Sequence, residues 1–180
     1  MSDVEVYRQR TEQVQEFLRA RRIRFALLTP SPNFEYLTGI HYTMRERLIA
    51  LVVMPDGPPV LVLPSFEQTN LSRMTWIEEV VPWSEDQDPY DLLAEIVSGS
   101  SGDTVALDDS LPLGVFRRFR DAVGGTLHEV SITPLLADMR LRKSEAELEL
   151  MRQAGKVIAA AVERAFNEAH VGMSELELNR

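Results

Sequence analysis

The sequence predicts an α/β fold in which a mixed β-sheet is flanked by helices. Two apolar runs, at 48–54 and 59–63, are joined by Pro55-Asp56-Gly57-Pro58, which is typical of an antiparallel hairpin. Strand-like and helix-like segments then alternate over residues 65–130, as in layered α/β proteins. A chain of 180 residues with 44% hydrophobic content can also bury a sizeable core.

The segments before the hairpin have clear boundaries. Apolar residues on one face predict an amphipathic helix over 6–22. A short strand follows over 23–29 and is ended by Pro30. A brief helix is then predicted between Ser31, as its N-cap, and Gly39, just beyond its last residue.

The segments after the hairpin complete the layers of the fold. In chain order they are a helix from Ser65, a strand over 77–82, a helix from Pro89, a strand over 104–108, a helix from Pro112 and a strand over 126–130.

The chain is expected to contain one domain and the start of another. We assign 1–133 to the α/β domain, 134–143 to a linker with a short helix, and 144–180 to the first helices of a second, truncated domain. Ser144 and Glu147 form a capping box at the start of a long helix that is expected to end at Gly172 and to span roughly 37 Å. A second capping box, Ser174 with Glu177, starts another helix. The long helix has an apolar seam that requires a partner surface. The seam consists of Leu148, Met151, Gly155, Ile158, Val162, Ala165 and Ala169.

Charge and composition exclude several classes of function. The net charge is −9 and the pI is about 4.9, so nucleic acids and anionic membranes are not expected as partners. There is no cysteine, which excludes disulfides, thiolate metal sites and cysteine nucleophiles. The longest apolar run, Leu-Ile-Ala-Leu-Val-Val-Met, is far too short to cross a membrane, and a cytoplasmic location is expected.

One basic cluster stands out against this acidic background, Arg-Ala-Arg-Arg-Ile-Arg at 19–24. Arg21 and Arg22 fall where the first helix should end, and cations there complement the negative end of the helix dipole. That structural role is favoured, with contact to an anion or a partner as the alternative.

The sequence contains no complete catalytic constellation. It has no glycine-rich phosphate loop, no nucleophile elbow and no pair of histidines spaced for a metal site on a helix. Asp108 and Asp109 end a strand, where α/β proteins often place ligands, although turn formation and capping of the next helix are favoured.

The loop over 39–48 is different, because polar and aromatic residues crowd into it just before an apolar strand. It carries His41, Tyr42, Arg45 and Arg47. The rigid donor fork of arginine suits a carboxylate, so this loop is a candidate site for a small anionic ligand. The alternative is that Arg47 pairs with Glu46 or another nearby acid and that the loop is ordinary surface.

Three stretches resemble the motifs of one enzyme family. Residues 33–40, Asn-Phe-Glu-Tyr-Leu-Thr-Gly-Ile, with Glu46 and Arg47 after them, resemble the signature of the N-terminal domain shared by prolidases, aminopeptidases P and creatinases. Residues 141–154 resemble the junction with the catalytic domain of that family, the pita-bread domain. Residues 172–178 resemble the next turn of the same domain.

This resemblance implies a ribonuclease H-like α/β layer and a longer parent enzyme that cleaves Xaa-Pro bonds, most like an Xaa-Pro dipeptidase. In the family, two divalent metal ions (manganese, cobalt or zinc) are held by two aspartates, one histidine and two glutamates of the pita-bread domain. These ligands are expected after Arg180, so we assign no catalytic or metal-ligating residue here. The chain alone is expected to be non-catalytic and to hold no cofactor.

The resemblance also implies a role for the 39–48 loop. In the family this loop reaches toward the active site of the neighbouring subunit of a homodimer, and it limits access to short Xaa-Pro peptides. Arg47 is therefore the first substrate-adjacent candidate, followed by His41, Arg45 and Tyr42. Ile40 departs from the aromatic residue that is more usual at its position.

Two other functions are compatible with the same architecture. One is a non-catalytic, peptidase-like module that binds protein partners, for which the acidic charge would suit basic partners. The other is a creatinase-type amidinohydrolase. A downstream sequence with or without the metal ligands would separate the binding module from an enzyme, and substrate assays would separate the two enzymes.

Overall fold

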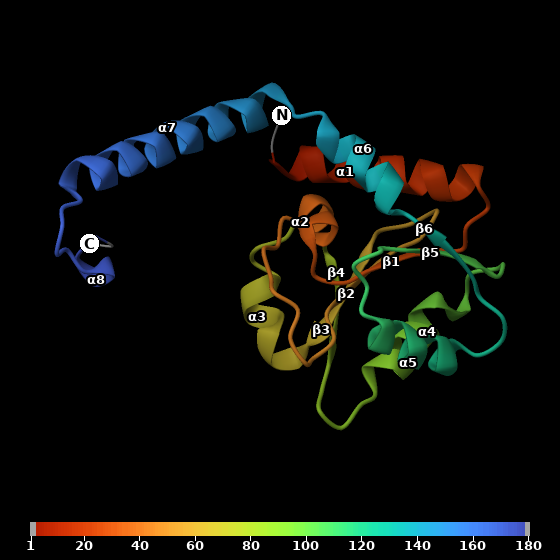
Figure 1. Cartoon of the computed structure of the whole chain (residues 1–180). Coiled ribbons are helices and arrows are strands. Elements are labelled where there is room, and N and C mark those ends of the chain that lie inside the picture. The colour runs from red at the N-terminus through yellow and green to blue at the C-terminus, as the bar shows by residue number, and fades with distance from the viewer. Residues whose placement is uncertain (1–2, 179–180) are drawn as a thin grey trace. The chain divides into compact units, whose positions relative to one another are not determined.

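The computed structural model describes residues 3–178. The chain forms two compact units (Figure 1). The first unit ends at Arg140 and the second begins at Leu141. The first contains the whole β-sheet, and the second consists of helices.

A mixed sheet of six strands forms the centre of the first unit, in the order β4-β3-β2-β1-β5-β6. The two pairs β1–β2 and β2–β3 are antiparallel and the other three are parallel, which confirms the predicted fold class and the predicted hairpin. The strands are β1 (Ala26–Leu28), β2 (Ala50–Val53), β3 (Val60–Pro64), β4 (Glu79–Trp83), β5 (Thr104–Leu107) and β6 (His128–Ser131).

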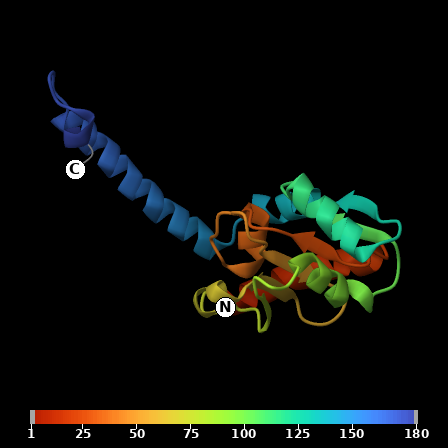
Figure 2. The same cartoon turned by 90° about the horizontal axis from the view of Figure 1, so that it is seen from below.

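Helices cover both faces of this sheet, giving three layers (Figures 1 and 2). Because successive side chains of a strand point to opposite faces, Leu28 packs in the cluster that contains residues of α1, α2 and α6, whereas Leu27 packs with α4 and α5. The helices of these layers are α1 (Asp3–Ala20), α2 (Pro32–Thr38), α3 (Gln68–Leu71, after the 3-10 turn Ser65–Glu67), α4 (Pro89–Ser98), α5 (Leu113–Val123) and α6 (Thr133–Leu141).

Of residues 134–143, which are expected to form a linker with a short helix, residues 134–141 lie within α6. Leu136 of this helix is fully buried in the core of the first unit. Arg140 donates from Nη1 to Oδ1 of Asn33 at 3.0 Å, and Tyr36 donates to the carbonyl of Met139 at 3.3 Å. The helix therefore packs as part of the α/β layers.

The second unit contains α7 (Glu145–Glu168) and α8 (Glu175–Leu178). Both expected capping boxes are present, at Ser144 with Glu147 and at Ser174 with Glu177. The prediction that the long helix runs to Gly172 was wrong. The backbone becomes extended at Ala169, and Gly172 belongs to a separate turn with φ of 93°.

The apolar seam of α7 is exposed to solvent. Met151 is 56% exposed and Ile158 63%, and no residue of the described α7 is buried. A helix with an uncovered apolar stripe ordinarily gains its stability from a packing partner.

The buried carboxylate of Asp108, at the end of β5, joins three segments of the first unit. It is 2% exposed and accepts hydrogen bonds from Ser31 (2.7 Å), Asn33 (3.0 Å), Ser110 (2.8 Å) and Thr133 (3.0 Å). These donors belong to the start of α2, the turn after β5 and the start of α6. The predicted role of Asp108, turn formation and capping of the next helix, therefore describes only part of what this residue does.

The environment of Asp108 also controls its ionisation. Burial alone would raise the pKa of this carboxyl, but the four hydrogen bonds outweigh burial and hold the pKa below its ordinary value. The group is therefore an anion at neutral pH, with both oxygens fully engaged.

We expect Asp108→Ala to lower the free energy of unfolding by about 2–4 kcal/mol, because four donors lose their acceptor, including the buried amide of Asn33. Urea unfolding followed by tryptophan fluorescence measures this loss, since both tryptophans, Trp76 and Trp83, lie in the first unit. Asp109→Ala is the matched control, because Asp109 is exposed, and it should change stability little.

The stability that Asp108 contributes should depend on pH. Because the folded-state pKa of Asp108 is lowered, its contribution is complete above the unfolded pKa, about 3.9, and is lost as the pH falls through the folded-state value. Asp108→Asn should lack this part of the acid-induced loss of stability. Equal acid sensitivity in both proteins would contradict the assigned role.

Candidate functional site

The loop at 39–48 begins at a tightly defined helix end. Ser31 caps α2 by accepting a hydrogen bond from the backbone N–H of Phe34 at 3.1 Å. Gly39 ends the helix with φ of 78°, a left-handed conformation that favours glycine. The ring of Tyr7 packs against this glycine, so that a Cβ added there would lie 3.0 Å from the Cζ atom of Tyr7.

Both ends of the loop are held through backbone carbonyl groups. Trp76 donates its indole N–H to the carbonyl of Leu37 at 2.8 Å, just before the loop, and Trp83 donates to the carbonyl of Leu48 at 3.0 Å, at its end. Thr75 also donates to the carbonyl of Thr38 at 2.8 Å. The loop therefore leaves and re-enters the fold at fixed points.

The four candidate residues of the loop do not all lie together. Tyr42, Arg45 and Arg47 line one groove of about 520 Å³, together with Glu46, Phe66 and Glu67. His41 is absent from this lining. It is 82% exposed and its Nδ1 lies 2.9 Å from Oε2 of Glu35, on α2.

Arg47 is held at the groove by an ion pair and an aromatic ring. Its Nε donates to Oε1 of Glu85 at 2.6 Å, and its guanidinium lies 5.3 Å from the ring centre of Phe66. Arg47 does therefore pair with a nearby acid, although the partner is Glu85. Its side chain stays 49% exposed, and its two terminal nitrogens have no hydrogen-bond partner among residues 3–178.

The protonation states of the groove follow from its contacts. Partial burial and the hydrogen bond that Tyr42 donates to Glu67, at 3.1 Å, raise the pKa of the Tyr42 phenol. The hydrogen bond to Glu85 and its negative charge raise the pKa of Arg47. At neutral pH the groove thus presents a neutral phenol and a permanent cation, which suit binding rather than proton transfer.

Three residues of this site were missed from the sequence: Phe66, Glu67 and Glu85. Phe66 and Glu67 follow strand β3, and Glu85 follows β4. The one available signal was Phe66, an aromatic residue in a polar stretch that proves to be 58% exposed.

Metal ligands and membrane spans were also sought in the described part of the chain. Between residues 3 and 178, no three His, Asp or Glu side chains are arranged to hold a metal ion. No helix described here combines the length and apolar character needed to cross a membrane.

Comparison with known proteins identifies the family. The model of the creatinase/prolidase N-terminal domain matches residues 10–142. The chain belongs to this family. This assignment confirms the resemblance noted in the sequence, and it agrees with the observed six-stranded mixed sheet.

Relatives of this creatinase/prolidase N-terminal domain include peptidases. The probable dipeptidase PepE of Mycobacterium tuberculosis is 31% identical over 159 residues, covering 87% of this chain and 42% of the relative. The crystal structure of dipeptidase PepE from Mycobacterium ulcerans is 28% identical with a TM-score of 0.80, covering 98% of this chain and 48% of that one.

A prolidase from Thermococcus sibiricus gives a similar result. Its crystal structure is 26% identical with a TM-score of 0.83, covering 96% of this chain and 47% of that one. The chain therefore spans less than half the length of each of these three relatives.

We expect Gly39→Ala to destabilise this creatinase/prolidase N-terminal domain by about 1–2 kcal/mol, because alanine resists the left-handed conformation and would crowd Tyr7. Urea unfolding measures the change. Gly99→Ala is the control, since Gly99 has φ of −74° and open space around it, and it should leave stability unchanged or raise it by up to about 1 kcal/mol. A Gly39→Ala protein as stable as wild type would refute the assigned strain.

Proposed function

We propose that this chain is the N-terminal domain of a dinuclear-metal Xaa-Pro dipeptidase, in which it gates substrate access and helps to form a homodimer. The family match over residues 10–142 carries the proposal. The names of the relatives, a probable dipeptidase and a prolidase, support the reaction class. Short Xaa-Pro peptides would be the substrates.

The described residues do not fit the two metal ions of such an enzyme, since no set of three His, Asp or Glu side chains converges among residues 3–178. The metals, which would be manganese, cobalt or zinc, would be held by another part of the longer polypeptide proposed to contain this chain. This agrees with a chain that spans less than half the length of each of those three relatives. No catalytic step is assigned to residues of this chain.

The role proposed for this chain is recognition at the 39–48 loop. Arg47 has two terminal nitrogens that are free to bind the carboxylate of a short peptide, in the bidentate geometry that guanidinium favours. The exposed ring of Phe66 beside it offers an apolar surface for a proline ring. Arg45 and Tyr42 would complete the groove, with His41 outside it.

The exposed apolar seam of α7 supports the proposal that the functional protein is longer than this chain. Residues 144–180 would be the first helices of the pita-bread domain, and further chain of that domain would cover Met151, Ile158 and Val162. Covering these side chains would recover the hydrophobic stabilisation that the uncovered seam forgoes.

We expect the 180-residue chain to hydrolyse no Xaa-Pro dipeptide, even with manganese, cobalt or zinc added, because it lacks a metal-binding set among its described residues. Release of proline from Ala-Pro measures the activity. Metal-dependent turnover that rises in proportion to the concentration of purified chain would refute the proposed division of roles.

In the longer polypeptide proposed to contain this chain, we expect Arg47→Ala to lower kcat/KM for Xaa-Pro dipeptides at least about tenfold, or about 1.4 kcal/mol. Steady-state kinetics with a dipeptide series measures the change. Arg118→Ala is the matched control, because Arg118 is also exposed, paired with an acid (Asp88, 3.4 Å) and placed over an aromatic ring (Tyr90, 4.3 Å). If both variants behave alike, Arg47 has no special role.

A further inference from the structure

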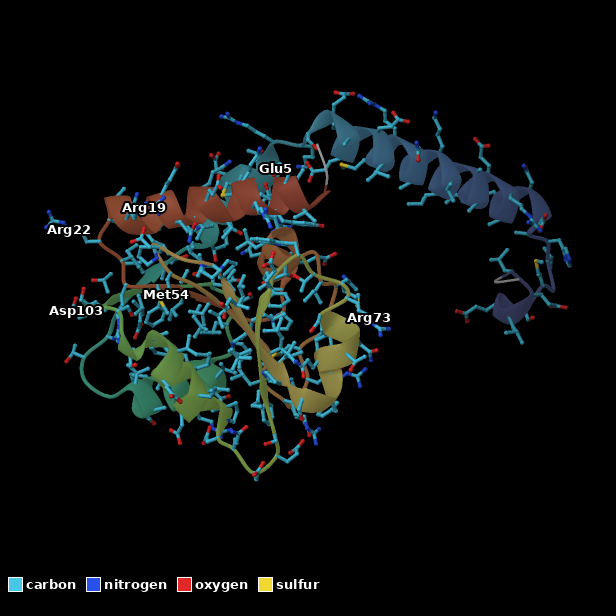
Figure 3. The ribbon with its side chains drawn as sticks, turned by 180° about the vertical axis from the view of Figure 1, so that it is seen from behind. Glu5, Arg19, Arg22, Met54, Arg73 and Asp103 are labelled. Carbon is cyan, nitrogen blue, oxygen red and sulfur yellow. The ribbon has the colours of Figure 1, made fainter. Side chains whose placement is uncertain are left out.

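A second groove lies in the first unit, between the C-terminal ends of α1 and α4. It has a volume of about 740 Å³ and is lined by Arg19, Arg22 and Arg24 of the basic cluster and by the loop Gly99-Ser100-Ser101-Gly102. Figure 3 labels two of its arginines, Arg19 and Arg22, at the end of α1, with Met54 near them. We call this hollow the arginine groove.

Arg22 occupies a position where the fold itself would prefer glycine. The N–H of Ile23 bonds to the carbonyl of Leu18 (2.9 Å) and the N–H of Arg22 to that of Arg19 (3.1 Å), which forms a Schellman motif. Arg22 is at the left-handed position of this motif, with φ of 55°, and is the one described non-glycine residue with positive φ. Helix termination therefore does not require an arginine here.

Arg24 lies deeper in the arginine groove and contacts neutral partners. Its Nε donates to Oγ of Ser100 at 2.9 Å, and its Nη2 donates to the carbonyl of Val97, in the last turn of α4, at 2.7 Å. Part of its charge is offset by the negative end of the α4 dipole. No carboxylate among residues 3–178 pairs with it.

The charges of the arginine groove are unbalanced. Three arginines line it against one acid, Asp56, which pairs with Arg19 at 3.3 Å. The guanidinium of Arg22 has no hydrogen-bond or ion-pair partner within the described chain. Asp103, next to the loop, lies 3.4 Å from the imidazole of His128. The groove therefore carries an excess of positive charge in a protein of net charge −9.

Donors for an anion come from two segments around the arginine groove. Beside Arg22 and Arg24, the hydroxyl and backbone N–H of Ser101 and the backbone N–H of Gly102 have no partner among residues 3–178. Donors supplied by two separate segments suit a phosphate, which offers more acceptor oxygens than a carboxylate does.

We propose that the arginine groove binds the phosphate group of a small anion, inorganic phosphate or a phosphate monoester, through Arg22, Arg24 and the loop at 99–102. The long side chain of Arg22 supplies a movable cation, and Arg24 a fixed one. The site is independent of the 39–48 loop and of the proposed peptidase reaction.

The test is a titration of the ¹⁵N-labelled 180-residue chain with inorganic phosphate and with phosphoserine, against sodium chloride at the same ionic strength. Saturable shifts of the amide signals of Ser101 and Gly102 are expected with at least one of the two probes. Arg22→Gly should weaken that binding by about tenfold, the loss expected for a charge-assisted hydrogen bond, with an unchanged or higher melting temperature. Arg22→Lys should retain part of it.

Arg73→Gly is the control, because Arg73 is an exposed arginine on the opposite side of the domain from Arg22 (Figure 3). It should bind phosphate as wild type does. Absence of saturable shifts with both probes overturns the proposal, and so does equal binding by wild type and Arg22→Gly. If Arg22→Gly proves less stable than wild type, Arg22→Asn, which also tolerates the left-handed conformation, decides by the same criterion.

Discussion

The buried carboxylate of Asp108 is the interaction on which the rest of the first unit depends. It accepts hydrogen bonds from the start of α2 and from the start of α6, and Asn33 passes the connection on to Arg140 near the end of α6. A charge can stay buried at this position because every oxygen is satisfied. The direction of α2, and hence the point from which the 39–48 loop departs, follows from this network.

The polar residues discussed above fall into two groups: those whose hydrogen-bonding groups all have partners within the fold, and those that keep donors without a partner. Asp108 and Thr38 have their partners within the fold, and they hold elements in place. Arg47 and Arg22 keep donors that no described residue accepts, and each stands beside a groove. Spare capacity therefore separates Arg47 and Arg22, which we propose to bind ligands, from groups that support the structure.

Helix caps and the fold class were predictable from the sequence, and individual long-range contacts between side chains were not. The Ser31 cap, the Gly39 end and the Ser144 capping box depend on residues within one or two turns, so short patterns define them. The pairing of Arg47 with Glu85 joins residues 38 positions apart and depends on how β4 lies beside β3. No local pattern contains that information, and the partners of Asp108 were hidden for the same reason.

The manner in which the 39–48 loop is anchored has an evolutionary consequence. Two indole groups hold it through the carbonyls of Leu37 and Leu48, which every amino acid would provide equally well. The exposed side chains between these points can thus be exchanged, and even the number of residues can vary, without disturbing the anchors. Related proteins can therefore vary the exposed surface of this segment while keeping the same scaffold.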